Sequence, residues 1–243
     1  MGRALALSLS AALAGCVTIA PSSFGTFAGV MPCADCAGIL TELHLYTMQG
    51  RPTSYELMET YMGTRDGDRS IGTTGRWATV GGSAGEGSAT VVQLDLGGAG
   101  SRRNFLRVGE DELRRLDANR KELQSAGPHS LHRVSELPPV TLVEADSGRT
   151  IDVERGQRVY VALGANRTAG YAWTLEASGT ALLVSLGNPI YAQSADIAGS
   201  GGTSMWFFGA VRAGRQDFVF RYRRPWDQGA PPLKTVTFAV TVR

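Results

Sequence analysis

Cys33 and Cys36 are separated by two residues, a spacing that suits three kinds of chemistry. The pair can close a small disulfide, which is structural or, where it is easily reduced, a redox switch. It can also supply two thiolates to a soft metal such as Cu(I) or Zn. A thioredoxin-type catalytic pair needs a βαβ context, and the strand-rich pattern around these cysteines lacks one.

A closed zinc site is disfavoured at this pair because such a site needs four ligands. The chain offers three histidines, His44, His129 and His132, and no second pair of cysteines. We therefore expect a structural disulfide and no cofactor, with copper bound by Cys33 and Cys36 as the alternative.

The third cysteine, Cys16, follows a segment typical of exported proteins. Arg3 supplies a positive charge, and residues 4–14 are an apolar stretch too short to span a membrane, which takes about 20 apolar residues. The run Leu13-Ala14-Gly15-Cys16 resembles a bacterial lipobox, in which the cysteine is lipidated and becomes the new N-terminus. An ordinary signal peptide with a chance cysteine is the alternative.

The lipobox predicts a signal peptide over residues 1–15 and a lipidated tether over residues 16–23. Acyl chains on Cys16 would anchor the protein firmly, since each buried methylene adds about 0.8 kcal/mol. Val17 follows the cysteine, whereas in lipoproteins of this kind an aspartate there favours retention in the inner membrane. We therefore expect a lipid-anchored protein of the bacterial cell envelope, in the outer membrane. Export also predicts an oxidising environment for the cysteine pair.

Three loop segments in the second half of the chain have residues suited to binding. Glycine adopts left-handed turns and lets a partner approach the backbone closely. A tryptophan after a proline is presented on a loop with a fixed backbone angle, and aromatic anchors dominate interfaces. Each segment alone is an ordinary turn or hairpin, so the prediction depends on the order of all three. Their residues are Asn166, Thr168, Gly170 and Tyr171, then Gly199, Gly201 and Gly202, then Arg224, Pro225 and Trp226.

Alternating apolar residues predict that strands flank these loops. The clearest alternation runs through residues 159–163, 218–222 and 236–242. This pattern predicts a two-sheet sandwich over residues 139–243, with its loops gathered at one end. Trp173 and Trp206 lie in predicted strands, so we expect them in the core.

Residues 24–135 also have the pattern of strands, separated by glycine-rich turns such as Gly81-Gly82. Alternation at Leu43 and Leu45 favours a small antiparallel barrel or meander. Residues 110–116 are predicted as one short helix. Two consecutive prolines, Pro138 and Pro139, mark a stiff join between two separate domains. The fold class is all-β.

Composition excludes several classes of function. The chain has 243 residues, of which 43% are hydrophobic and 19% charged, as in folded globular proteins. A net charge of +2 is too small to predict nucleic-acid binding. Because the sequence has no metal-binding helix motif and no supported Cys–His dyad, we predict that the chain is not an enzyme.

The first domain resembles the NlpE N-terminal domain, a family of envelope lipoproteins. The resemblance rests on the run Gly29 to Ile39 around the cysteine pair, on Tyr61-Met62-Gly63 and on Gly75-Arg76-Trp77. It implies a small lipocalin-like β-barrel. It also implies links to copper handling, surface sensing and envelope stress signalling.

The second domain resembles chagasin-type inhibitors of papain-like cysteine proteases, which carry Asn-Pro-Thr-Thr-Gly-Tyr-x-Trp, Gly-x-Gly-Gly and Arg-Pro-Trp in this order. The resemblance implies an immunoglobulin-like β-sandwich that wedges three loops into the active-site cleft of the protease. It implies that Thr168 enters near the catalytic cysteine, that residues 199–202 lie along the substrate cleft and that Trp226 packs on the primed side. Arg224 and Pro225 would support the third loop.

Two positions depart from the family pattern. Arg167 stands where proline is usual, and Ala169 where threonine is usual. We expect binding to survive with a changed potency or target range. The basic cluster Arg221, Arg223 and Arg224 would assist approach to an acidic protease rim, or is a solvated face.

The predicted function is an envelope lipoprotein whose second domain inhibits papain-like cysteine proteases. The alternative is an envelope stress sensor or copper-responsive sensor that acts through the first domain. The expected partners are the protease and, through the lipid anchor, the outer membrane.

Overall fold

The computed structural model describes residues 20–83, 86–95, 102–124, 127–177, 182–194, 199–227 and 229–243. The predicted signal peptide, Cys16 and the first residues of the tether lie outside these ranges. Regular structure in the described residues consists of strands and two short 3-10 helices, which confirms the all-β prediction. Within the same residues, no helix is both long enough and apolar enough to cross a bilayer.

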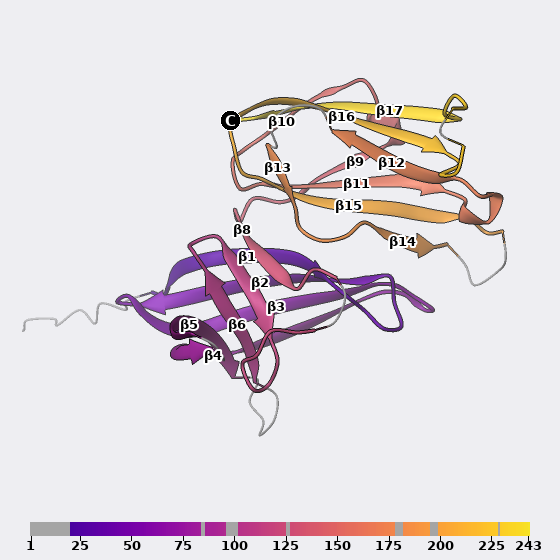
Figure 1. Cartoon of the computed structure of the whole chain (residues 1–243). Coiled ribbons are helices and arrows are strands. Elements are labelled where there is room, and N and C mark those ends of the chain that lie inside the picture. The colour runs from indigo at the N-terminus through magenta and orange to yellow at the C-terminus, as the bar shows by residue number, and fades with distance from the viewer. Residues whose placement is uncertain are drawn as a thin grey trace, which may run out of the picture.

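The first half of the chain forms a closed barrel of antiparallel strands (Figure 1). Each strand pairs with the next along the chain, and β8 closes the barrel by pairing with β1. The barrel strands are β1 (Ser22–Met31), β2 (Gly38–Met48), β3 (Arg51–Thr64), β4 (Gly67–Ser83), β5 (Glu86–Asp95), β6 (Arg103–Val108), β7 (Glu112–Leu116) and β8 (Ser130–Val134). The predicted barrel is confirmed, and its first strand begins inside the segment predicted as a tether.

The barrel interior is filled by apolar side chains from alternate positions of its strands. Leu43 and Leu45, whose alternation predicted a strand, are fully buried. The register places Leu43 between Phe27 and Leu57 on neighbouring strands. These four side chains belong to one buried cluster, so the period-2 pattern of the sequence does specify the inner face of the barrel.

The short helix predicted over residues 110–116 is wrong, because β7 occupies most of this segment and pairs with β6. Leu113 and Leu116 are three residues apart, as are residues on one face of a helix, but both lie in strand β7. Leu113 shares its face of the strand with Arg115, since alternate residues point the same way. The Arg115 guanidinium lies 5.5 Å from the centre of the Phe105 ring, and burial lowers the pKa of Arg115.

The second half of the chain forms two facing sheets, which confirms the predicted sandwich. One sheet has the order β10-β17-β16-β12, and the other has the order β13-β15-β11-β9, with β14 also paired to β15. The strands are β9 (Val140–Val143), β10 (Thr150–Val153), β11 (Arg158–Ala165), β12 (Ala172–Ala177), β13 (Leu183–Ser185), β14 (Ile190–Gln193), β15 (Gly202–Ala210), β16 (Gly214–Arg223) and β17 (Lys234–Val242). The 3-10 helices are η1 (Glu144–Asp146) and η2 (Arg167–Ala169).

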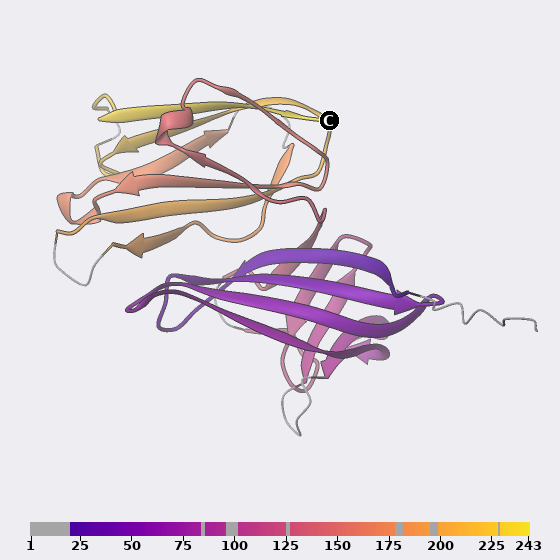
Figure 2. The ribbon, with the colours of Figure 1, turned by 180° about the vertical axis from the view of Figure 1, so that it is seen from behind.

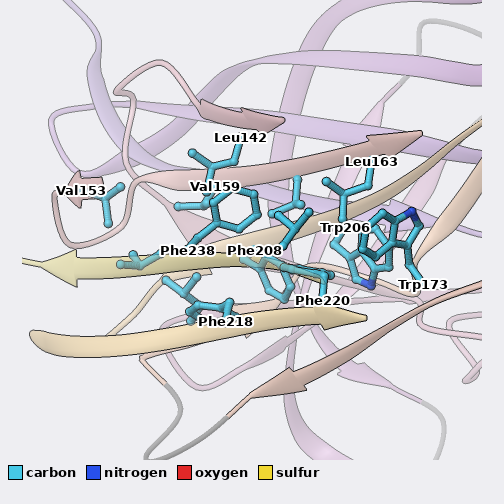
Figure 3. Close-up of a cluster of buried hydrophobic side chains, with 14 of the residues drawn as sticks. Leu142, Val153, Val159, Leu163, Trp173, Trp206, Phe208, Phe218, Phe220 and Phe238 are labelled. Carbon is cyan, nitrogen blue, oxygen red and sulfur yellow. The ribbon is translucent and has the colours of Figure 1, made fainter. Parts of the chain in front are cut away.

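Aromatic side chains from both sheets fill the space between them (Figure 3). The Phe220 ring lies 4.9 Å from the Trp206 ring of the opposite sheet and 6.0 Å from the Phe238 ring of its own sheet, centre to centre. Trp173 and Trp206 are both buried, as their strand positions predicted. The Trp173 indole N–H donates to the carbonyl of Gly164, so its polar atom is satisfied inside the core.

The barrel and the sandwich contact each other through buried apolar side chains. A third buried cluster joins Ala28 and Val30 of β1 to Leu186, Ile190 and Phe207 of the sandwich. The contact is continued by backbone hydrogen bonds, among them Val30 N–H to the Leu186 carbonyl at 2.6 Å. Strand β1 is therefore buried on both faces, one toward the barrel interior and one toward the sandwich. The views in Figures 1 and 2 both show the barrel beneath the β14 side of the sandwich.

Replacing Val30 by alanine is expected to lower the free energy of unfolding of the full chain by about 1–2 kcal/mol, because two buried methyl groups are lost. Since Val30 belongs to a cluster shared by both halves, the chain should unfold in one transition that shifts as a whole. Thermal unfolding followed by circular dichroism measures this. The matched control is Val143→Ala, which shortens an exposed valine and should change stability little. Two separate transitions, with only the barrel affected, would contradict the shared core.

Stability is expected to fall as the pH drops below about 6.5, through His132. Burial lowers the pKa of this imidazole, and the nearby Glu112 carboxylate opposes the shift to a smaller extent. The unfolded chain then takes up the proton at a higher pH than the folded chain, so protonation favours unfolding. Denaturant unfolding at about pH 7.5 and pH 5 should give a steeper loss for the native chain than for His132→Gln. Equal slopes would exclude His132 as the cause.

Candidate functional site

Loop 1 (residues 166–170) connects β11 to β12 and is built around Tyr222 of β16. The Asn166 N–H donates to the Tyr222 hydroxyl oxygen at 2.6 Å, and that hydroxyl donates back to the Asn166 carbonyl at 3.3 Å. The Thr168 hydroxyl donates to Asn166 Oδ1 at 2.6 Å. Gly170 ends the turn with a φ of 77°, which glycine adopts without strain. Loop 1 is thus a short, internally bonded turn whose central residues are exposed.

Loop 3 (residues 224–227) follows β16 and lies against loop 1. The Trp226 ring covers Gly170 so closely that a Cβ on this glycine would lie 2.7 Å from the ring. The Trp226 side chain is nevertheless 71% exposed, the highest value among the large exposed hydrophobic residues described. The Arg224 guanidinium lies 5.1 Å from the centre of the Tyr171 ring, and the Asp227 N–H donates to the Arg224 carbonyl. An aromatic surface therefore faces solvent directly beside loop 1.

Loop 2 (residues 199–202) leads into β15 and is also adjacent to loop 1. Gly199 and Gly201 have φ values of 86° and 72°, so both use conformations that other residues rarely adopt. A Cβ on Gly201 would lie 3.3 Å from the carbonyl oxygen of Ala165, the residue before loop 1. Gly202 pairs with Ala165 in the sheet. The glycines thus let loops 1 and 2 approach each other closely.

Arg167 of loop 1 makes a further contact toward loop 2. Its guanidinium lies 4.3 Å from the centre of the Tyr191 ring on β14, a cation–π geometry that stabilises exposed sites by about 0.5–1 kcal/mol. Arg167 stands at the position where the resembled inhibitor family usually has proline. A side-chain contact with β14 therefore restrains loop 1 where a proline ring restrains the family loop.

The basic cluster at the end of β16 is largely paired. Arg221 and Arg223 both lie close to Glu176 of β12, at 3.1 Å and 3.3 Å. Arg224 instead stacks on Tyr171 in the exposed loop 3. Within the described residues of loops 1–3, Arg167 and Arg224 are exposed cationic residues.

Cys33 and Cys36 form a disulfide, which confirms that prediction. The bridge lies in the connection between β1 and β2, and the Asp35 carboxylate is close to both sulfur atoms. A cleft of about 240 Å³ separates this connection from residues 188–190 of the sandwich. The disulfide is therefore at the end of the barrel that adjoins β14, not inside the barrel core.

Replacing Gly170 by alanine is expected to displace Trp226 and weaken any binding that uses loops 1 and 3 about fivefold. The new methyl group would collide with the Trp226 ring, and φ is positive at this position. The emission maximum of tryptophan fluorescence would report the displacement of the ring, and the dissociation constant of a bound partner would report the loss of affinity. Gly164→Ala is the matched control, because a Cβ there meets open space and its φ is not in the left-handed range. Unchanged affinity of Gly170→Ala for that partner would separate Trp226 from the binding surface.

Sequence reasoning identified the residues of the three loops but not the residues of neighbouring strands that support loop 1. The structure adds Tyr222, whose hydroxyl group orders loop 1, and Tyr191, on which Arg167 stacks. Tyr222 was visible only as one apolar member of an alternating strand. Nothing in the sequence pointed to Tyr191. Its contact with Arg167 joins segments 24 residues apart, and the sequence does not reveal which strands are neighbours.

Two family models match this chain. Residues 152–242 match the chagasin family of peptidase inhibitors (I42), and residues 27–126 match the NlpE N-terminal domain. Both are families of non-enzymes, which confirms the prediction that the chain is not an enzyme. Lipoprotein NlpE of Escherichia coli (strain K12) is 30% identical over 151 residues, which cover 59% of this chain and 58% of that protein. The chain thus matches little more than half the length of that curated relative.

Three solved structures are similar to less than half of this chain. The cysteine protease inhibitor EhICP2 from Entamoeba histolytica has 21% identity and a TM-score of 0.39, covering 43% of this chain and 94% of that one. Amebosin has 29% identity and a TM-score of 0.36, with coverages of 44% and 99%. PbICP-C, solved in complex with falcipain-2, has 14% identity and a TM-score of 0.32, with coverages of 45% and 94%.

Proposed function

We propose, from the match of residues 152–242 to chagasin family peptidase inhibitors, that the sandwich inhibits papain-like cysteine proteases by inserting loops 1–3 into the active-site cleft. One observation carries this proposal: three loops far apart in sequence contact one another at one end of the sandwich. Trp226 lies on Gly170, Gly201 adjoins Ala165, and together they form one exposed edge.

The mechanism is exclusion of substrate and needs no bond chemistry from this chain. Loop 1, in the middle of the edge, enters the cleft with Thr168 toward the catalytic cysteine. Loop 2 offers glycine backbone groups to one side of the cleft, and Trp226 of loop 3 packs on the other side. Because Thr168 already donates to Asn166, the turn keeps its shape without the protease.

Preorganisation supports tight binding by this edge. The hydroxyl of the buried Tyr222 bonds to both backbone groups of Asn166, and the Arg167–Tyr191 contact restrains the other side of loop 1. A loop that is ordered before binding loses less conformational entropy when it meets its partner. Arg167 and Arg224 add positive charge beside the edge, which would speed association with an acidic protease rim.

The same proposal places the protein in the bacterial cell envelope, anchored through lipidated Cys16 to the outer membrane. The support is the lipobox-like sequence at residues 13–16 and the match of residues 27–126 to the NlpE N-terminal domain. Labelling with a radioactive fatty acid, lost in Cys16→Ser, tests the lipid anchor. Fractionation of the two membranes tests its location.

Titration of papain and related cysteine proteases with the full mature chain tests the inhibitory function. We expect competitive inhibition at micromolar inhibitor or below, with the inhibitor left uncleaved after prolonged incubation. A serine protease serves as the control and should keep its full activity. The proposal would be overturned if every papain-like protease of the panel kept its full activity at about 10 µM inhibitor. A dissociation constant of about 10 µM corresponds to a binding free energy of about 7 kcal/mol in magnitude.

A second candidate function is metal sensing at the barrel end, and it rests on one cluster. Donor atoms of Cys33, Asp35 and Cys36 all lie within 4.8 Å of one another. The two sulfur atoms are joined in a disulfide, so a soft metal such as Cu(I) fits this donor set only after reduction. Cu(I) titration of the reduced chain against Cys33→Ser tests this, and equal binding by both proteins would exclude the pair.

A further inference from the structure

We propose that the β3–β4 hairpin of the barrel (residues 61–69) is a fourth contact surface for the protease, beside loop 2. The inference rests on the proposed inhibitory function and extends its interface from the sandwich to the barrel. Neither matched family model covers both halves of the chain, so neither describes a surface shared by the two.

Strand β14 lies between the hairpin and the exposed edge that loops 1–3 form. A Cβ on Gly63, at the end of β3, would lie 3.1 Å from the Cβ of Ala192 on β14 and 3.1 Å from the Cβ of Ala37. Three small residues thus let β14 pack directly on the barrel beside the disulfide-bonded connection. Ala192 pairs with Thr203, the residue directly after loop 2, so the base of loop 2 is in contact with the base of the hairpin.

The four segments follow one another in a continuous row of contacts. Trp226 of loop 3 lies on Gly170 of loop 1, and Arg167 of loop 1 stacks on Tyr191 of β14. Ala192, the next residue of β14, contacts Gly63 of the hairpin. Figures 1 and 2 both show the violet β3–β4 hairpin projecting from the same end of the molecule as the sandwich loops.

The hairpin is ordered and its tip is exposed. The Gly63 N–H donates to Asp68 Oδ1 at 2.8 Å, and the Thr64 hydroxyl donates to the Gly67 carbonyl. Residues 65–69 are exposed and carry charges of both signs. A cleft of about 770 Å³ lies between this hairpin and the disulfide-bonded connection. The tip therefore offers charged groups beside a recess at the edge of the proposed interface.

The size of an ordinary interface supports a contribution from the hairpin. A stable protein–protein interface takes about 20–30 residues from each partner, and loops 1–3 are together shorter than this. A protease seated on loops 1–3 extends beyond them on the side of loop 2, where the hairpin is the next segment in the row. Charges at a rim of this kind change the association rate and its salt dependence more than the dissociation rate.

Hydrogen exchange of the full mature chain, measured with and without papain, tests the inference. We expect slower amide exchange at residues 64–68 as well as in loops 1–3 when papain is bound. Protection of loops 1–3 with no change at residues 64–68 would overturn the fourth contact while leaving the proposed function intact. Failure of papain to bind at all would instead count against the proposed function.

Charge reversal gives a second measurement with a matched control. Arg65→Glu should change the association rate constant for papain at least about threefold and alter its dependence on salt. Arg51→Glu makes the same change at the other end of β3, about 40 Å away along the strand, and should leave both unchanged. Identical kinetics for the two variants and the native chain would show that the barrel supports β14 without touching the protease.

Discussion

Trp226→Ala is expected to weaken inhibition of papain by about 30-fold, equivalent to about 2 kcal/mol. The indole is 71% exposed in the free protein, yet its ring lies against Gly170, and Pro225 restricts the backbone before it. A large, exposed and positioned aromatic ring is the usual anchor of a protein interface. Burying it against a protease recovers apolar surface that the free protein leaves in water.

The inhibition constant and the thermal midpoint should respond differently to this change. Because Trp226 contributes little to the core, Trp226→Ala should unfold at nearly the native temperature. Val211→Ala is the matched control, since Val211 is an exposed apolar residue that precedes β16, whereas loop 3 follows that strand. Equal inhibition constants for Trp226→Ala and the native chain would remove loop 3 from the proposed interface.

Phe220→Ala is expected to lower the free energy of unfolding by about 3–5 kcal/mol, the range for truncating a buried aromatic side chain. Phe220 is fully buried and contacts Trp206 across the sandwich and Phe238 beside it (Figure 3). Its removal leaves a cavity between two sheets whose strands are paired on both sides of it. A domain has only about 5–15 kcal/mol of net stability, so this is a large share.

Urea unfolding followed by circular dichroism measures the loss. Phe220→Leu, which keeps much of the volume, should cost less than half as much. Leu233→Ala is the exposed control and should stay within about 0.5 kcal/mol of the native chain. A small effect of Phe220→Ala would mean that the core collapses around the missing ring.

The alternation of apolar residues predicted some strands of the fold but not others. Alternation at Leu43 and Leu45 or at Phe218 and Phe220 assigns strands because one face of each is buried. The same rule fails for β7, where Arg115 occupies an inward position beside Phe105 and breaks the apolar pattern. The alternation rule also gives no information about the second partner of β1. A strand that is buried on both faces shows no alternation of apolar and polar residues.

The residues of the candidate site and the gathering of its loops at one end of the sandwich were predicted, but the contacts that hold the loops were not. Glycine, proline and tryptophan at the three loops have local conformational meaning, which one sequence reveals. The support from Tyr222 and Tyr191 depends on strand pairing and on side-chain direction. The role of the basic cluster also depended on tertiary structure, because Glu176 pairs with Arg221 and Arg223 and leaves Arg224 beside Tyr171.

The sequence by itself determined the all-β class, the two strand-rich halves, the residues of the three loops and the pair of cysteines. These follow from local physical chemistry: period-2 burial, turn conformations and the spacing of two thiols. Only the tertiary structure decided that the barrel and the sandwich share a core and that the β3–β4 hairpin lies beside β14. Contacts such as Gly63 with Ala192 join residues far apart in the chain, and their closeness depends on how whole sheets pack.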